Sequence, residues 1–166
     1  MKLSEQSSSE ATVEEAFAAR CEQSVREDAC RESHAISWDV SIVPGTDGSV
    51  RIQVDRVMPP DVPDFIKRFL GETIQVRQVE EWGSTNASGG RTANVKVTIK
   101  GQPASMVGKA SLQPTADGST EIVEGDVKVN VPFLGKKIES EISKVIASAL
   151  KIEQRVGLEW IRANRG

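Results

Sequence analysis

The feature that most constrains the fold is a long apolar stripe near the C-terminus. Apolar residues recur there at steps of three and four, at Ile138, Ile142, Val145, Ala149, Ile152, Val156 and Trp160. This spacing predicts an amphipathic α-helix, and roughly 28 residues of helix are about 42 Å long. A stripe of that length needs a broad surface to cover, and a curved antiparallel sheet supplies one.

The sheet is indicated by alternating apolar and polar residues, the pattern of strands with one buried face. In the first alternating segment, we expect the inward side chains to be Ile36, Trp38, Val40 and Ile42. Alternation or turn-bounded apolar segments predict strands over residues 36–42, 50–55, 73–82, 93–99, 104–113 and 120–131. Residues 2–8 alternate weakly and predict a further strand at the edge of the sheet.

Two helices are predicted before the alternating segments. Thr12 and Glu15 form a capping box, in which each side chain caps the other residue's backbone amide. Val13, Phe17 and Cys21 then recur at steps of four along one side of the helix. A second short helix is expected to end near residue 33.

A third short helix interrupts the run of strands. Residues 59–63 contain three prolines, which cannot continue a central strand. Residues 64–70 follow as a helix with Phe65, Ile66 and Phe69 on one side, and Gly71 suits its C-terminal end. This helix is either a lid over a cavity or, as is more common for such a stripe, part of the core.

Composition excludes several classes of function. The chain has 166 residues, which fits one domain over 1–166, with 59–70 inserted between two strands. The net charge is −3 and no dense Lys/Arg block occurs, so nucleic-acid binding is not expected. No apolar run reaches the ~18 residues of a membrane span, and residues 1–6 show no signal-peptide core. A cytoplasmic location is therefore expected.

No catalytic residue, metal site or cofactor is predicted. His34 is the single histidine, and with Cys30 it makes at most two ligands, whereas metal sites usually need three or four. We interpret His34 as a solvated residue between a helix and a strand. The sequence also contains no G-x-S-x-G nucleophile motif and no phosphate-binding G-K-[ST].

The order of elements, with hairpin-linked strands and helices at the ends, predicts an α+β fold with an antiparallel meander. This order resembles the helix-grip fold of the START-like (Bet v 1-like) superfamily, whose members include polyketide cyclases and lipid-transfer domains. The resemblance implies a sheet that curls around the final helix and leaves a cavity between them. Closer similarity is to the actinobacterial family called domain of unknown function 2505, in Val54–Pro59, Asp61–Phe65, Gly71–Ile74, Glu80–Gly83, Gly125–Val129 and Val131–Glu139. That family implies no established activity.

Strand phase gives the candidate site. Arg56 continues the inward face of Val54, and Gln78 and Glu80 continue that of Val76. A buried charge is costly unless it is paired, which suggests an Arg56–Glu80 pair. The alternative, more common for such residues, is that a bulge or the strand end turns them to solvent.

We therefore expect a START-like protein that binds or carries a hydrophobic or amphipathic small molecule. Arg56, Gln78 and Glu80 would orient its polar head, and Trp38, Met106 and Trp160 would contact its apolar body. One alternative is a polyketide cyclase or aromatase in which Glu80, paired with Arg56, has a pKa perturbed by burial. Another is a co-chaperone or interaction module with a filled core and an exposed patch around Phe65 and Phe69; no protein partner is predicted.

Overall fold

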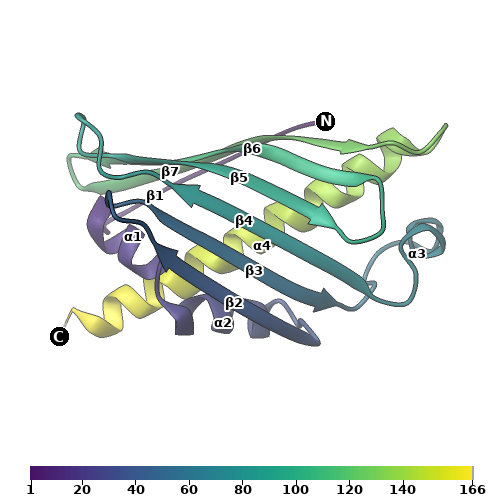
Figure 1. The fold of residues 1–166 in the computed structure, drawn as a ribbon, viewed down its shortest axis with the longest axis horizontal. Helices are drawn as coiled ribbons and strands as arrows, with labels where there is room; N and C mark the ends of the chain where they lie inside the picture. Colours follow the sequence, from purple (N-terminus) through teal and green to yellow (C-terminus); the bar gives the residue numbers. More distant parts are fainter. Residues whose placement is uncertain (166) are drawn as a thin grey trace.

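Seven strands form one antiparallel sheet in the order β1-β7-β6-β5-β4-β3-β2 (Figure 1). The computed structural model describes residues 1–165, so Gly166, the last residue of the predicted domain, lies outside the described residues. Strands β2 to β7 follow one another as a meander, whereas β1 (Lys2–Ser9) pairs with β7 at the far edge. The predicted edge strand at residues 2–8 is confirmed.

The six strands of the meander all occur where alternation predicts them. They are β2 (Ser37–Pro44), β3 (Val50–Met58), β4 (Ile74–Trp82), β5 (Arg91–Ile99), β6 (Ala104–Thr115) and β7 (Gly118–Val129). One inward assignment is wrong, because Ile36 is exposed. It precedes the first residue pair of edge strand β2, Ser37 with Val57, and so lies beyond the covered face.

Strands β6 and β7 carry glycines in register. Gly108 lies opposite Gly125, and a Cβ atom on Gly108 would collide with the backbone carbonyl oxygen of Glu124. Glycine therefore permits a close approach of two backbones that a side chain would prevent.

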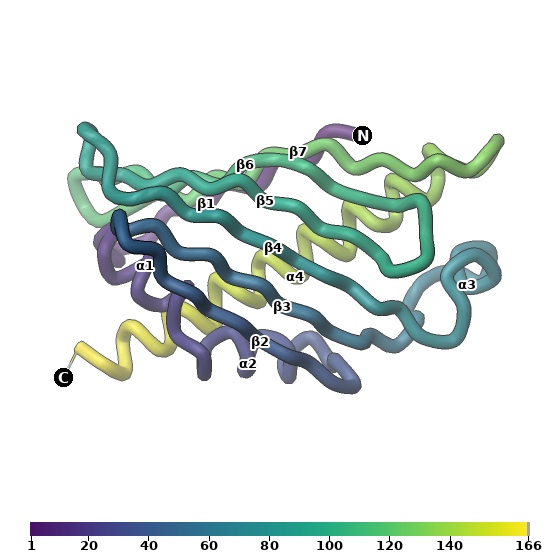
Figure 2. The backbone as a smooth tube through the Cα atoms, viewed as in Figure 1, coloured from purple at the N-terminus to yellow at the C-terminus, as the bar shows by residue number. Residues whose placement is uncertain are grey.

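Helix α4 (Gly135–Asn164) has 30 residues, about 45 Å, and runs diagonally across the concave side of the sheet (Figure 2). Of the predicted stripe, Ile138 and Val156 are buried, and Ile161, just beyond its last member, packs with Ala11 and Ala19. Val145 is an exception: it is exposed, and Ile146 packs against the core in its place. No helix among residues 1–165 is long and apolar enough to cross a membrane.

Helices α1 (Val13–Arg20) and α2 (Gln23–Glu32) connect β1 to β2 on the same side as α4. The capping box is confirmed, since Thr12 Oγ1 accepts from the Glu15 amide and the Glu15 carboxylate accepts from the Thr12 amide. Both helices contact α4. They therefore cover one end of the concave face.

Helix α3 (Asp64–Leu70) lies at the opposite end of the sheet, where it packs beside the start of α4 (Figure 1). Ile66 is fully buried in a cluster with Leu70, Val129 and Ile138. Phe65 and Phe69 pack partly buried against that cluster. In this structure the apolar side of α3 therefore packs against the core.

Candidate functional site

Three polar side chains point into the concave face, as strand phase predicts. Arg56, Gln78 and Glu80 are 7%, 8% and 1% exposed, so the alternative in which they turn to solvent is wrong. The reason is local: β3 extends to Met58 and β4 to Trp82, so the alternation continues past all three residues without a bulge or a strand end.

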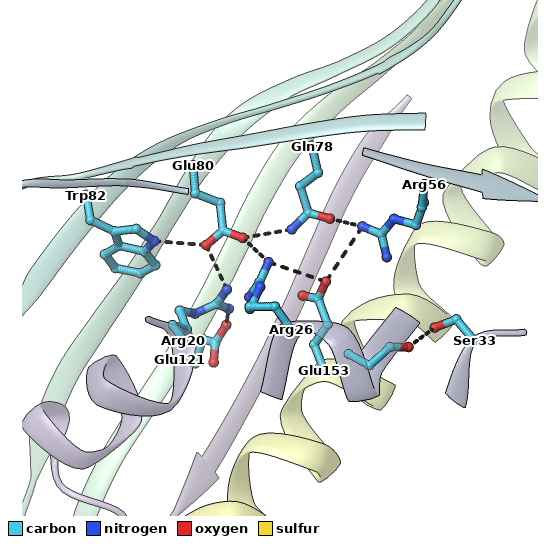
Figure 3. Close-up of polar contacts among 10 residues, drawn as sticks. Arg20, Arg26, Ser33, Arg56, Gln78, Glu80, Trp82, Glu121 and Glu153 are labelled. Carbon is cyan, nitrogen blue, oxygen red and sulfur yellow. Dashed lines mark hydrogen bonds and ion pairs between the residues drawn. The ribbon is translucent and has the colours of Figure 1, made fainter. Parts of the chain in front are cut away.

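Glu80 is the centre of a buried polar network (Figure 3). Its Oε1 accepts from Arg20 Nη1 and from Trp82 Nε1, each at 2.9 Å. Its Oε2 accepts from Arg26 Nη2 at 2.5 Å and from Gln78 Nε2 at 2.8 Å. Four donors therefore saturate a carboxylate from which water is excluded.

The predicted direct pair between Arg56 and Glu80 is wrong. Register places Arg56 opposite Val76, four residues before Glu80 on β4, and four residues of strand span about 13 Å. Gln78 bridges the gap, because it accepts from Arg56 Nη2 and donates to Glu80. The two charges are thus connected through an amide.

Sequence reasoning missed Arg20, Arg26 and Glu153. Each lies on the inward side of its helix: Arg20 is three residues after buried Phe17 in α1, and Arg26 lies beside buried Val25 in α2. Glu153 follows partly buried Leu150 by three residues in α4. Their positions relative to buried apolar residues of the same helix could have predicted that they face inward, just as alternation along β4 predicted it for Gln78.

Glu153 extends the network to the helix that covers it. Its Oε1 lies 3.6 Å from Arg26 Nη2 and 3.8 Å from Arg56 Nη2. Arg20 also pairs with Glu121 on β7. The charges balance, three arginines against three glutamates, but Arg56 Nε and Glu153 Oε2 are buried without a hydrogen-bond partner in the described chain.

Electrostatics keep Glu80 ionised. Burial alone would raise the pKa of its carboxyl, but the charges of Arg26 and Arg20 and the hydrogen bonds from Trp82 and Gln78 outweigh burial and lower the pKa to about 2. A general acid needs a pKa near the working pH. Glu80 is therefore a structural anion, unlike the proton-transfer group that the cyclase alternative requires.

Of the hollows near the sheet, two bear on the candidate site. One, of about 50 Å³, lies beside the network between α1, α2, α4 and β7, and its polar lining includes Arg20, Arg26, Glu121 and Glu153. Ligand pockets have roughly 300–1,000 Å³, so this one suits water. A hollow of about 510 Å³ lies over β2, β3 and β4, and its lining combines outward side chains such as Asp55 and Arg77 with Trp38, Arg56 and Val76.

The α3 end of the concave face differs from the network end. A row of residues crosses the sheet in register there: Trp38, Arg56, Val76 and Ile99. Trp38, Val76 and Ile99 point inward but are only partly buried. On the facing helix, Ile142 and Ile146 are also partly buried, and Ile142 packs against both core clusters. We call the four strand residues Trp38, Arg56, Val76 and Ile99, three of them apolar, the apolar row.

The other predicted contact residues are spread over the molecule. Met106 is fully buried in the main core, opposite Val97. Trp38 donates to Glu27 Oε2 at 3.4 Å and carries the Arg31 guanidinium over its ring. Trp160 packs in a separate cluster with Ala11, Ala19 and Ile161. The structure thus brings Trp38, Arg56 and Gln78 together and leaves Trp160 apart.

His34 lies where the sequence predicts it, exposed directly after α2, with a φ of +64°. Cys30 is buried and Cys21 partly buried, and both are free thiols. Across the described residues, no group of three or more His, Cys, Asp and Glu is arranged to hold a metal ion.

The family described as "Protein of unknown function (DUF2505)" matches residues 4–161. The chain belongs to this family. An uncharacterized protein of Mycobacterium tuberculosis is 28% identical to it over 123 residues, which are 72% of this chain and 70% of the relative. The resemblance seen in segments such as Val131–Glu139 is confirmed.

Solved structures similar to this DUF2505 protein confirm the predicted helix-grip fold. The di-domain ARO/CYC StfQ from the steffimycin biosynthetic pathway has a TM-score of 0.63 at 14% identity, over 99% of this chain and 52% of that one. The STAR-related lipid transfer protein from Xanthomonas axonopodis has a TM-score of 0.55 at 11% identity, over 93% and 85%. At such identities the likeness concerns the fold.

Proposed function

We propose that this DUF2505 protein binds an amphipathic small molecule, a lipid or polyketide-like compound, between the apolar row and α4. The observation that carries the proposal is the partial exposure of Trp38, Val76 and Ile99, which point inward beneath a helix. A filled core would bury such side chains. Similar folds named for lipid transfer and for aromatase/cyclase activity add support by analogy.

Arg56 is the residue proposed to bind the polar head. It lies in the apolar row between Trp38 and Val76, and its Nε is buried without a partner in the described chain. Gln78 accepts from its Nη2, and Glu153 Oε1 lies 3.8 Å from the same nitrogen. A guanidinium fixed beside an apolar surface suits a carboxylate attached to a hydrocarbon.

The apolar body is proposed to lie along Val76, Val97 and Ile99, with Met106 beneath it. The 50 Å³ hollow beside the network is too small for such a body, so binding requires movement at the other end. Helix α3, with Phe65, Ile66 and Phe69, is the proposed lid. Pro63 and Gly71, whose φ is +85°, bound it as hinge positions. We place this activity in the cytoplasm.

Native mass spectrometry with oleic acid and with oleyl alcohol tests the proposal. Both should bind the wild-type protein, because their apolar bodies are equivalent. Arg56→Gln should weaken the acid by roughly tenfold or more, the cost of one charged hydrogen bond, and leave the alcohol nearly unchanged. Equal weakening of both would show that Arg56 does not bind the head.

A second pair of variants tests the location of the body. Val76→Trp fills the apolar row and should abolish binding of both ligands. Val107→Trp places the same bulk at an exposed position of β6 and is the matched control. Binding that survives Val76→Trp would place the ligand elsewhere, and no binding of either lipid by the wild type would contradict the proposed function.

A further inference from the structure

The loop between β7 and α4 carries an apolar tip. Phe133 is fully exposed, its neighbour Leu134 is 41% exposed, and Pro132 is exposed as well. Other large apolar residues at the surface, such as Val43 and Val107, are isolated on strands. The tip Pro132–Leu134 is therefore a contiguous apolar protrusion (Figure 1).

The tip is held in one conformation. Phe133 has a φ of +68°, in the left-handed region that bulky side chains rarely adopt. Turn hydrogen bonds fix it on both sides, from the Leu134 amide to the Pro132 carbonyl at 2.8 Å and from the Gly135 amide to the Val131 carbonyl at 3.0 Å. A strained residue whose ring finds no burial within the chain indicates a role outside it.

Positive charge follows the tip directly. Lys136 and Lys137 are exposed on the first turn of α4, and segment 130–137 contains no acidic residue. Helix α3 lies at the same end of the molecule and exposes Lys67 and Arg68 (Figure 1). Exposed acids also occur there, at Asp61, Asp64 and Glu72. Charge at this end is thus positive at the tip and mixed around α3.

We propose that the tip Pro132–Leu134, with Lys136 and Lys137, docks on an anionic lipid surface. A protruding tip buries little area against a folded partner, whereas a bilayer interface encloses it on all sides. Reversible membrane binding usually combines an apolar anchor with cations, and the tip supplies both. The chain as a whole carries a charge of −3, so repulsion of the remaining surface orients this end toward the lipid. The proposal does not rest on the ligand site at the apolar row.

Co-sedimentation with vesicles tests it. The wild-type protein should pellet with vesicles of equal parts phosphatidylcholine and phosphatidylglycerol, and much less with phosphatidylcholine alone. Phe133→Ser should weaken binding roughly tenfold or more, the effect of losing one buried aromatic side chain. Lys136→Gln with Lys137→Gln should weaken it roughly 10- to 30-fold, since each lysine near an anionic surface contributes about one fivefold factor, and high salt should do the same.

Matched controls separate the tip from general surface effects. Val107→Ser removes an exposed apolar side chain from β6, and Lys96→Gln with Lys109→Gln removes two exposed charges from the outer face. Neither should change vesicle binding. Phe133→Gly should raise the melting temperature, because glycine adopts the left-handed conformation freely, while still losing vesicle binding.

Two outcomes would overturn the proposal. One is a wild-type protein that stays in the supernatant with anionic vesicles at low salt. The other is concentration-dependent self-association without vesicles that Phe133→Ser abolishes, since the tip would then be an interface between copies of the chain. A failure here leaves binding of oleic acid in solution untouched, so the two proposals are judged separately.

Discussion

The two ends of the concave face differ in how completely their inward side chains are covered and paired. At one end α1, α2 and α4 enclose Glu80 with arginines, and every oxygen of its carboxylate is bonded. At the other end, α3 and the first half of α4 leave inward apolar side chains of the apolar row partly exposed. A paired ionic network resists rearrangement because opening it leaves buried charges without partners. An incompletely covered apolar surface, by contrast, can bind an apolar ligand. The first end is thus a scaffold, and the second is the proposed binding surface.

The largest expected effect comes from breaking the scaffold. Glu80→Ala leaves Arg20 and Arg26 buried without their main partner, which should cost about 3–5 kcal/mol of unfolding free energy. Glu81→Ala, on the outward side of the same strand, should change it by less than about 0.5 kcal/mol. Urea denaturation of both variants measures the difference. A cost for Glu80→Ala close to that of Glu81→Ala would mean that water reaches the arginines.

The same end should dominate acid unfolding. Because the folded pKa of Glu80 lies near 2, below its ordinary value of 4.5, its ionisation stabilises the fold fully above about pH 5. That stability is lost as the pH falls from about 5 to 2, and it amounts to about 3 kcal/mol. Unfolding free energies measured across this range should fall less in Glu80→Gln than in the wild type. Equal slopes would assign the acid sensitivity to other carboxyl groups.

The sequence predicted the two ends unequally well. Strand alternation placed Arg56, Gln78 and Glu80 inward, because side-chain direction along a strand is a local property. The partners of Glu80 come from α1 and α2, and which helix residue meets which strand residue depends on how the layers pack. The helical repeat could therefore predict only that Arg20 and Arg26 face inward. No local sequence pattern predicts their pairing with Glu80.

The apolar row shows a similar limit. Periodicity predicted that Val76 faces inward, and it does, with Ile99 of β5 opposite it. How completely a helix covers them depends on its tilt across the sheet and on the position of α3, which no short sequence segment specifies. The degree to which the helices cover these side chains was for this reason beyond the reach of sequence, whereas the fold was predicted almost completely.

The smallest expected effect is the cost of Ile99→Ala, which is compared with that of Ile52→Ala, one isoleucine in each region. Ile52 lies opposite Glu80 and is fully buried, so Ile52→Ala should cost about 2–5 kcal/mol, the loss of buried methyl groups plus a cavity. Ile99 lies in the apolar row and is partly exposed, so Ile99→Ala should cost only about 1 kcal/mol, because part of its surface already meets solvent. Urea denaturation of the ligand-free protein measures both.

Equal costs would mean that the apolar row is as tightly packed as the network end, and the distinction between scaffold and binding surface would then fail. A small cost for Ile99→Ala that grows when oleic acid is present would instead place the ligand directly on this residue, because only the wild type would then gain the full stabilisation from binding.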